Sequence, residues 1–565
     1  MKKEIMIVDG IPVALDGERN VLSVIRKAGI QLPTFCYHSE LSIHGACRMC
    51  MFEDEQGRLA AACSAIPEAG MNIRTNTARL RKYRKTILEL ILANHCRDCT
   101  TCQFSNDCKL QELANRFQIE DVRFPNTNLL RKIDASSPCI VKDQSKCILC
   151  GDCVRMCNEI QNVGAIDFAG RGSKMTVSTA FNIPLAESTC VGCGQCASSC
   201  PTGAIIVRDD SQLLWDAISD ENIKVTAQIA PAVRVAIGRA FGLGGSESAI
   251  GQITAALRRI GFDEVHDTVT GADMTVIEEA AEFVERLKQG PHEFPMFTSC
   301  CPAWVQFAEK KYPELMENVS TCRSPMQMFA SVIKASETDT RRHFHVAIMP
   351  CTAKKFEAAR SEFAVDGEPR VDLVITTQEL IHMIKESGIV FSELEPEAVD
   401  SKFAGLTGAG VIFGVSGGVT EAVLRSVSDD KSQTGLKFLA LTGVRGMEGI
   451  KETTIEVGGA KLRIGIVSGL NNASKLIQKI KEGEHFDLVE VMACPGGCVS
   501  GAGQPIAHSA EKRERGEGLY TADRHMSSKR SDENAVVAAL YEGILKDRSH
   551  ELLHVHYKPR EATQC

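Results

Sequence analysis

Aromatic residues are scarce in this 565-residue sequence, which has two tryptophans, six tyrosines and a total aromatic content of 5%. No apolar run approaches the roughly 18 residues of a membrane-spanning helix. No basic tract occurs, and the formal net charge is −8. Proteins that bind nucleic acids use clustered lysine and arginine together with aromatic stacking surfaces. We therefore expect neither a membrane nor a nucleic acid as a partner.

An export signal is also missing from the first residues, MKKEIMIVDGIPVALDG, which alternate like a strand and lack a long apolar core. No twin-arginine pair is found there either. Because secretory leaders need a continuous apolar segment, we expect a cytoplasmic protein. The length predicts several domains, and an apolar content of 44% is typical of globular proteins.

Cysteine is what the sequence has in excess, with 24 residues. A secreted, disulfide-rich protein is one interpretation, but the length and the missing leader oppose it. The cysteines are grouped, many of them two or three residues apart, as metal ligands often are. This grouping favours metal sites in a reducing compartment.

Three strand-like runs in the second half of the chain each end in a cysteine-bearing loop. They are found in FTSCCPAW, in VAIMPCTAKKFE and in LVEVMACPGGC. Ligands of open α/β folds bind at the carboxyl ends of strands, so we expect these loops to converge. Four thiolates, the ligand number of a 4Fe–4S cluster, would come from Cys301, Cys351, Cys494 and Cys498. Adjacent side chains point different ways, which leaves Cys300 free for another role.

The motifs TSCCPAW, MPCTAKKFE and EVMACPGGC resemble the three motifs of the iron-only (FeFe) hydrogenases. The resemblance implies that the four cysteines hold a cubane, and that Cys498 also bridges to a two-iron unit with carbonyl, cyanide and a bridging dithiolate. In this family the cubane and the two-iron unit together form the H-cluster, the site at which protons are reversibly reduced to molecular hydrogen. Residues 519–565 resemble the family's C-terminal wrapping segment, so the resemblance covers nearly the whole chain.

The first expected domain, residues 1–78, has short strands, a helix capped by Asn20, and cysteines in the spacing C-x10-C-x2-C-x12-C. These cysteines are Cys36, Cys47, Cys50 and Cys63. The segment looks like a plant-type 2Fe–2S ferredoxin domain with a β-grasp fold, although plant ferredoxins themselves have C-x4-C-x2-C. Its spacing is similar to that of the N-terminal domain of large hydrogenases and of a complex I subunit. A structural zinc ribbon is the alternative.

The second expected domain, residues 79–134, begins with a helix capped by Thr77 and is predicted to be small and helical. It contains the spacing H-x3-C-x2-C-x5-C, formed by His95, Cys99, Cys102 and Cys108. In the related proteins this run binds a 4Fe–4S cluster with one histidine ligand. Imidazole in place of thiolate makes a cluster less negative and tends to raise its potential. A zinc site remains the alternative.

The third expected domain, residues 135–209, repeats the spacing C-x2-C-x2-C-x3-C. This is the pattern of two-cluster bacterial ferredoxins, in which the fourth cysteine of each run ligates the other cluster. One cubane is expected on Cys147, Cys150, Cys153 and Cys200, and the second on Cys190, Cys193, Cys196 and Cys157.

From about residue 210 to residue 565, strands alternate with helices, which predicts an α/β catalytic domain with parallel or mixed sheets. Helices are predicted over 246–261 and 273–288, the latter with Asp273 as its N-cap. The whole chain is thus expected to be a multidomain α+β and α/β protein.

The helix over 273–288 carries two glutamates three residues apart, which is usually a solvated face. In the hydrogenases the matching residues form a proton path. The resemblance implies the order Arg286 at the surface, then Glu282, Ser320, Glu279 and Cys300. A buried carboxylate with a raised pKa could carry protons near neutral pH.

Further residues match those that contact the two-iron unit in the family. Lys354 matches the residue that holds a cyanide ligand, and an ammonium group suits a buried anion. Contacts to the diatomic ligands, the dithiolate or the apolar wall are expected from Ala230, Pro231, Ser324, Met349 and Met492. Glycines permit close approach to an inorganic group, and here they are Gly414, Gly417, Gly418, Gly496, Gly497, Gly501 and Gly503.

The chain departs from the common family pattern at Ala303, Met326 and Thr420, where glycine, glutamine and methionine are common. These departures affect the expected direction bias and oxygen sensitivity rather than the reaction class. Four cysteines have no assigned role, namely Cys96, Cys139, Cys322 and Cys565.

The sequence therefore predicts a hydrogenase with one 2Fe–2S and three 4Fe–4S accessory clusters. Its expected partners are ferredoxin or a flavodoxin-like carrier, and maturation proteins that insert the two-iron unit. One alternative is a subunit of a complex-I-like or bifurcating assembly, although the three cysteine motifs do not occur there. Another is a non-enzymatic iron–sulfur assembly or sensor protein. Those proteins generally lose the proton-path residues that are retained here.

Overall fold

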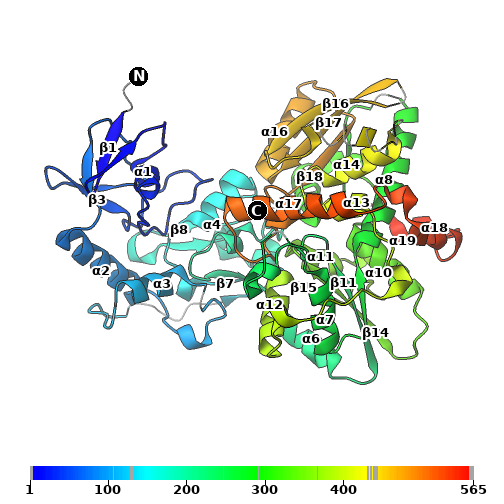
Figure 1. Cartoon of the computed structure of the whole chain (residues 1–565), viewed down its shortest axis with the longest axis horizontal. Helices are drawn as coiled ribbons and strands as arrows, with labels where there is room; N and C mark the ends of the chain where they lie inside the picture. Colours follow the sequence, from blue (N-terminus) through cyan, green and yellow to red (C-terminus); the bar gives the residue numbers. More distant parts are fainter. Residues whose placement is uncertain are drawn as a thin grey trace.

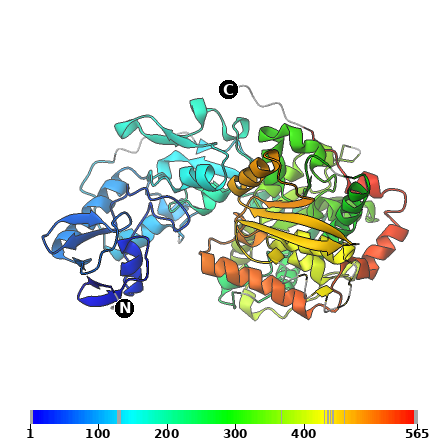
Figure 2. The ribbon, with the colours of Figure 1, turned by 90° about the horizontal axis from the view of Figure 1, so that it is seen from above.

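The computed structural model describes residues 4–558 except residues 106, 127–132, 246, 291, 366, 429, 431, 433–434, 437–438, 440–442 and 458. Cys565 and the end of the expected wrapping segment, residues 559–565, lie outside the described residues. Figure 1 shows a small N-terminal part in blue at one end and a larger part in green to red at the other. Figure 2 shows the same two-part arrangement from above, with the cyan segment between them. No helix in the described ranges is both long and apolar enough to cross a membrane.

The N-terminal part contains a five-stranded sheet in the order β2-β1-β5-β3-β4. Its strands are β1 (Ile5–Val8), β2 (Ile11–Ala14), β3 (Met51–Asp54), β4 (Leu59–Ala61) and β5 (Asn72–Arg74). Helix α1 (Val21–Lys27) shares one buried apolar cluster with these strands. As the sequence predicts, Asn20 caps this helix, its side chain accepting a hydrogen bond from the Ser23 amide at 3.0 Å.

Two helices follow, α2 (Ala78–Ala93) and α3 (Lys109–Arg116). The predicted cap of α2 is confirmed, because the Thr77 hydroxyl accepts from the Leu80 amide at 3.2 Å. Leu88 of α2 and Leu110 of α3 pack in one buried cluster with Phe35 of the first part. The helices thereby join the loops that carry the first two groups of cysteines.

The middle of the chain has two small sheets and two short helices. One sheet has the order β10-β7-β6 and the other pairs β8 with β9. The elements are β6 (Ile133–Asp134), β7 (Ile140–Asp143), β8 (Asp167–Ala169), β9 (Thr176–Ser178), β10 (Ile205–Val207), α4 (Asp152–Arg155) and α5 (Gln195–Ser198). Both helices begin after a glycine in the left-handed region, Gly151 with φ 76° and Gly194 with φ 68°. These turns fold each cysteine run back on itself.

The larger part is built on two four-stranded sheets. The first is parallel throughout, in the order β12-β11-β14-β15. Its strands are β11 (Ile223–Ile229), β12 (Glu264–Asp267), β14 (Arg342–Met349) and β15 (Leu373–Thr376). The second sheet has the order β13-β18-β17-β16 and is mixed, because β16 runs antiparallel to β17. Its strands are β13 (Met296–Phe297), β16 (Ile450–Val457), β17 (Ala460–Ser468) and β18 (Leu488–Met492).

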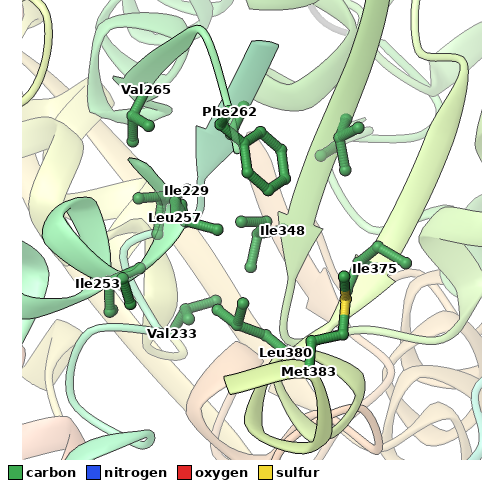
Figure 3. Close-up of a cluster of buried hydrophobic side chains, with 14 of the residues drawn as sticks. Ile229, Val233, Ile253, Leu257, Phe262, Val265, Ile348, Ile375, Leu380 and Met383 are labelled. Atoms are coloured by element: carbon green, nitrogen blue, oxygen red, sulfur yellow. The ribbon is translucent and has the colours of Figure 1, made fainter. Parts of the chain in front are cut away.

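Helices connect and cover these sheets. They are α6 (Ser211–Ile218), α7 (Ile250–Ile260), α8 (Val269–Lys288), α9 (Pro302–Lys311), α10 (Pro325–Ala335), α11 (Ala353–Ala358), α12 (Thr377–Glu386), α13 (Gly408–Val411), α14 (Gly418–Val427) and α16 (Leu470–Lys481). Figure 3 shows how Ile253 and Leu257 of α7 and Met383 of α12 meet Ile229 and Ile348 of the parallel sheet. This packing holds the strand ends in fixed positions relative to one another.

The predicted start of α8 is wrong, because the helix begins at Val269 and not after Asp273. Asp273 is fully buried one turn inside the helix. Its carboxylate accepts hydrogen bonds from Thr407 at 2.6 Å, Ser531 at 2.7 Å and Asn534 at 2.8 Å. An aspartate after small residues is typical of a helix start, but here long-range contacts hold it inside the helix. The helix predicted over 246–261 is shorter, spanning Ile250–Ile260.

The C-terminal segment contains α17 (Ser509–His525), α18 (Ala535–Glu542) and α19 (Ser549–Leu553). In Figure 1 it runs across the larger part, in orange to red. Its last residues pair with the loop before α10. The Arg323 amide donates to the Leu553 carbonyl and the Val555 amide to the Thr321 carbonyl, both at 2.8 Å.

Candidate active site

A cavity of about 760 Å³ lies where strands of both large sheets end. Ala230 follows β11, Pro350 follows β14 and Ala493 follows β18, and all three line this cavity. Helix α8 closes it on another side through Ala272. Strand ends that lie far apart in the sequence therefore meet at one place, as the strand-end rule predicts.

Four thiols lie around this cavity, those of Cys301, Cys351, Cys494 and Cys498. Burial raises the pKa of each, for Cys351 to about 12. Such thiols lose their protons only to a bound metal, so metal binding here would release protons. The Cys301 sulfur already accepts a hydrogen bond from the Ala493 amide at 3.4 Å.

The number and chemical type of these donors suit an iron–sulfur cluster. No three His, Cys, Asp or Glu side chains of the described residues converge closely enough to hold a single metal ion. A polynuclear iron–sulfur cluster instead needs its thiolates spaced around its edges. The cavity walls are largely apolar, formed by residues such as Met349, Met492 and Phe413. The donor set and the cavity therefore fit a cubane with an attached inorganic unit.

Lys354 lines the same cavity and supplies a positive charge. Its ammonium group donates to the Cys300 carbonyl at 3.2 Å and pairs with Glu357 at 2.6 Å. Burial opposes this charge, but the Glu357 carboxylate outweighs burial and raises the pKa of Lys354. A protonated lysine is thus held where an anionic ligand could accept its hydrogen bond.

Three of the expected proton-path residues, Glu279, Glu282 and Arg286, follow one another along α8, and the Glu279 carboxylate has no hydrogen-bond partner in the described structure. Cys300 lines the cavity, and Glu279 is fully buried behind it. The Ser320 hydroxyl donates to the Glu282 carboxylate at 2.7 Å. Burial, reinforced by the charge of Glu282, raises the pKa of Glu279 to about 8. Burial and the Glu279 charge also raise the pKa of Cys300.

Arg286 stands at the outer end of the expected order. Arg286 is half-buried, and its guanidinium donates to the Phe294 carbonyl at 3.0 Å and to the Asn318 side chain. Among the described residues it forms no ion pair with Glu282. Glu282 is held instead by Ser320 and by the Thr321 amide at 3.1 Å.

Five of the expected cofactor contacts do not line the cavity, namely Ser324, Gly417, Gly418, Gly496 and Gly503. A Cβ at Gly417 would lie 2.0 Å from the Val444 carbonyl, and one at Gly418 would lie 1.8 Å from the Ile412 carbonyl. These glycines are therefore needed for close backbone packing at the start of α14. The Gly417 amide donates there to the buried Glu490 carboxylate at 2.6 Å. Ser324 is buried just outside the cavity and precedes α10.

Several residues that line the cavity were not predicted from the sequence, among them Thr268, Ala272, Pro325 and Phe413. Thr268 directly follows β12, so the rule that found the cysteines could have found it. Phe413 follows no strand and carries no polar group, and nothing in the local sequence marks it. Met326, noted as a departure from the family pattern, does line the cavity.

The middle part of the chain contains two smaller cavities, each lined by four thiols. One, of about 400 Å³, is lined by Cys147, Cys150, Cys153 and Cys200. The other, of about 460 Å³, is lined by Cys157, Cys190, Cys193 and Cys196. The fourth cysteine of each run thus lies with the other run, as in two-cluster ferredoxins.

The first two cysteine groups lie close to one of these cavities. Cys36 and Cys47 of the first part, Cys108 of the second and Cys150 of the third share one apolar cluster. Arg155 links them further, because its guanidinium donates to the Cys36 carbonyl at 3.0 Å and pairs with Asp152.

His95 is buried near Cys96, and its Nε2 atom has no hydrogen-bond partner in the described structure. Burial lowers its pKa to about 4, so the imidazole stays neutral. Its Nδ1 atom accepts a hydrogen bond from the Arg97 amide at 3.2 Å, so the ring proton lies on Nε2, and a metal bound at Nε2 would displace that proton.

Comparison with protein families gives matches along most of the chain. The model described as iron only hydrogenase large subunit, C-terminal domain, matches residues 223–502, and that of iron hydrogenase small subunit matches 509–560. A 2Fe-2S iron-sulfur cluster binding domain matches residues 4–78, and a 4Fe-4S dicluster domain matches 146–204. The NADH-ubiquinone oxidoreductase-G iron-sulfur binding region matches residues 84–123.

Whole-chain relatives agree with these matches. The NADP-reducing hydrogenase subunit HndD of Solidesulfovibrio fructosivorans is 39% identical and covers 98% of both chains. Iron hydrogenase 1 of Clostridium pasteurianum is 34% identical over 98% of this chain and 99% of its own length. A solved FeFe hydrogenase from Chlamydomonas reinhardtii is 37% identical, with a TM-score of 0.54, over 62% of this chain and 99% of that chain.

Proposed function

The chain belongs to the iron-only hydrogenase family, and from this premise we propose that it interconverts protons and molecular hydrogen with electrons from a small carrier. It is an oxidoreductase with 2Fe–2S and 4Fe–4S ferredoxin-like domains and an H-cluster. The observation that carries the proposal is the 760 Å³ cavity, where four thiols, Lys354 and Cys300 meet. When bound there, the H-cluster would supply the metal centre at which hydrogen is formed or split.

The chain's own residues would then hold this group and move its proton. Cys301, Cys351, Cys494 and Cys498 are proposed as ligands of the cubane, with Cys498 also holding the two-iron unit. Lys354, kept charged by Glu357, would donate to a cyanide ligand. Cys300 would exchange a proton at its sulfur with the bound group, and Glu279 would resupply it.

The proton supply continues along α8 to the surface. Glu279, with its pKa near 8, can both take and release a proton at neutral pH. Ser320 would pass the proton between the two glutamates, since its hydroxyl already donates to Glu282. Arg286 marks the outer end, where its half-buried side chain meets solvent.

Electrons would arrive through four accessory clusters, one 2Fe–2S and three 4Fe–4S. The proposed ligands are the cysteines of the three N-terminal domains that were predicted from their spacing, together with His95. The apolar cluster shared by Cys36, Cys108 and Cys150 supports convergence of the outer two clusters on the cubane of Cys150. The cubane of Cys190 would deliver the electrons, because Lys310 of the catalytic part donates to the Cys190 carbonyl at 2.8 Å.

Ferredoxin or a flavodoxin-like protein is proposed as the carrier, and the cytoplasm as the location. A second candidate role, as the hydrogenase subunit of an NADP-reducing assembly, is favoured by the match to HndD over 98% of both chains. Purification from native cells separates the two. A carrier-dependent enzyme is active alone with reduced ferredoxin, whereas a subunit of an assembly co-purifies with a partner and couples hydrogen to NADP only in its presence.

Infrared spectroscopy of matured protein tests the proposed function directly. Carbonyl and cyanide bands, together with about 20 iron atoms per chain, are expected from the proposed set of clusters. An iron-loaded protein without these bands would be an iron–sulfur assembly or sensor protein instead. Fewer than about 16 irons in fully matured protein would remove at least one proposed cluster.

A further inference from the structure

Gln195 connects the middle part of the chain with the active site. It lies between Cys193 and Cys196, which line the 460 Å³ cavity, and it is the first residue of α5. Its side chain points out of its own domain. The amide Nε2 lies 3.1 Å from the Cys494 sulfur and 3.2 Å from the Ser500 carbonyl oxygen. Only 2% of Gln195 is exposed, so water does not compete for these contacts.

The second contact fixes the orientation of the amide. The Ser500 carbonyl can only accept hydrogen bonds, so the atom facing it is the nitrogen and not the oxygen. The same NH₂ group faces Cys494, and it therefore donates a hydrogen bond to that sulfur. Gln195 lies between Cys193 and Cys196, two proposed ligands of an accessory cluster. Its amide donates to Cys494, a proposed ligand of the catalytic cubane.

The loop that carries Gln195 is pressed tightly against the catalytic part. Gly194, in the left-handed region, has no room for a side chain, because a Cβ would lie 2.5 Å from Thr352 Oγ1 and 2.7 Å from the Ala502 Cβ. The Thr352 hydroxyl donates to the Gly192 carbonyl at 2.7 Å. Contacts on both sides of Gln195 thus hold its amide against Cys494.

A hydrogen bond to a cluster sulfur changes the potential of the cluster. Reduction adds negative charge, and the added charge spreads onto the thiolate sulfurs. A donor to such a sulfur stabilises the reduced state more than the oxidised one and raises the potential. The effect is greater in a buried site, where the effective dielectric constant is low.

We propose that Gln195 is a positioning residue that raises the reduction potential of the cluster bound through Cys494, so that electrons pass readily from the cluster of Cys193 and Cys196. This inference rests on the proposed function, in which Cys494 is a ligand of the catalytic cubane. It assigns to an accessory domain part of the control over the catalytic cluster. The loop that carries Gln195 would then both deliver electrons to the catalytic cluster and set the reduction potential of that cluster.

Gln195→Leu removes the donor while keeping most of the side-chain volume. Gln161 provides a matched control, because it is 1% exposed, comes from the same middle part, and donates to the Ala493 carbonyl at 2.9 Å. Gln161→Leu thus removes a buried hydrogen bond to the same catalytic loop that does not go to a sulfur, and since Gln161 lines the 460 Å³ cavity, the potential of that accessory cluster is followed as well. Both variants are prepared as full-length, matured protein, and the potential of the catalytic cubane is measured by infrared and electron paramagnetic resonance titration.

In Gln195→Leu we expect the reduced fraction of the catalytic cubane to fall at fixed potential, by about tenfold in the reduced-to-oxidised ratio. This corresponds to about 59 mV for a one-electron couple. The carbonyl bands should remain, and Gln161→Leu should keep the wild-type potential. Gln195→Met, which is flexible and also lacks a donor, should repeat the shift if the leucine variant folds poorly.

An unchanged potential in both Gln195 variants would overturn the inference. An equal shift in Gln161→Leu would overturn it as well, because the cause would then be the contact between domains and not the donor. Failure of the proposed function shows separately, as missing carbonyl and cyanide bands in the wild-type protein.

Discussion

The accessory part and the catalytic part of this chain bring thiols together in opposite ways. In the accessory part, most members of a set lie a few residues apart, as Cys190, Cys193 and Cys196 do. In the catalytic part, Cys301 and Cys498 are separated by nearly two hundred residues and follow strands of one sheet, while Cys351 follows a strand of the other. In each accessory set a turn brings three thiols together and the fourth comes from the other cysteine run, whereas the distant site needs the packed core of both sheets.

The two parts also differ in their titratable groups. The accessory thiols lie in apolar clusters beside backbone amides. The catalytic thiols lie beside Glu279, Lys354 and Cys300, all of them buried or facing the cavity. Electron transfer needs no acid or base, and proton transfer does. Buried carboxylates occur in both parts, but Asp152 of the accessory part is paired with Arg155, whereas Glu279 of the catalytic part lies behind Cys300 at the cavity.

The largest effect is expected from breaking the distant thiol set. Cys351→Ser should abolish hydrogen turnover, because a hydroxyl is a poor ligand for iron that prefers thiolate. The accessory clusters should survive, since their sites are built locally. Infrared spectra should lose the carbonyl bands while electron paramagnetic resonance retains the accessory signals. Loss of those signals too would show that the two parts do not fold independently.

The next effect concerns the two adjacent cysteines. Cys300→Ser should leave the carbonyl bands nearly intact yet lower turnover by roughly 10²–10⁴-fold, the contribution of positioned acid–base groups. A serine hydroxyl is far less acidic than a thiol, and Cys300→Asp should restore part of the rate. Cys301→Ser is the control and should disturb the cubane itself. If Cys300→Ser instead empties the cluster, the two roles are reversed.

A smaller effect is expected in the pH profile. Proton supply through Glu279 needs its protonated form, so hydrogen evolution should fall as pH rises through about 8, the pKa of this group. Glu282→Gln removes a charge that raises this pKa, and the fall should move to lower pH. Glu278→Gln is the control, because Glu278 bonds Tyr541 and His554 instead. The profile is measured with reductant in excess, and an unshifted Glu282→Gln profile would contradict the coupling.

The smallest effect is expected in the accessory part. His95→Cys should keep the cluster of Cys99, Cys102 and Cys108 but lower its potential, because thiolate adds negative charge. Turnover should change little, since no proton passes there. A redox titration followed by electron paramagnetic resonance measures the shift. Identical titrations for variant and wild type would mean that His95 is not a ligand.

The same contrast explains how much could be predicted from the sequence. Spacing alone predicted the grouping of Cys147, Cys150 and Cys153, and a known exchange rule added Cys200. The described structure brings each group of thiols to one cavity, because such grouping depends on backbone geometry that short sequence patterns specify; their role as cluster ligands stays a prediction.

Residues placed by long-range contacts were not predictable in this way. Asp273 looks like a helix cap, yet partners more than one hundred and thirty residues away hold it inside α8. Gly417 looks like part of a cofactor loop, yet its missing side chain makes room for the Val444 carbonyl. In both cases the residue that makes the contact lies far away in the sequence, and no local sequence pattern predicts it.

The pairing of residues 553–555 with residues 321–323 has a consequence for the order of events on the ribosome. Domains fold as they emerge, and the accessory part, whose sites are local, can fold while the rest is still being made. The loop that carries Ser320 and precedes α10 is completed only when Leu553 and Val555 have left the exit tunnel. The hydrogen bonds from Ser531 and Asn534 to the Asp273 carboxylate likewise form only after these residues have been made. We therefore expect the accessory domains to be able to fold before the last contacts of the catalytic part have formed.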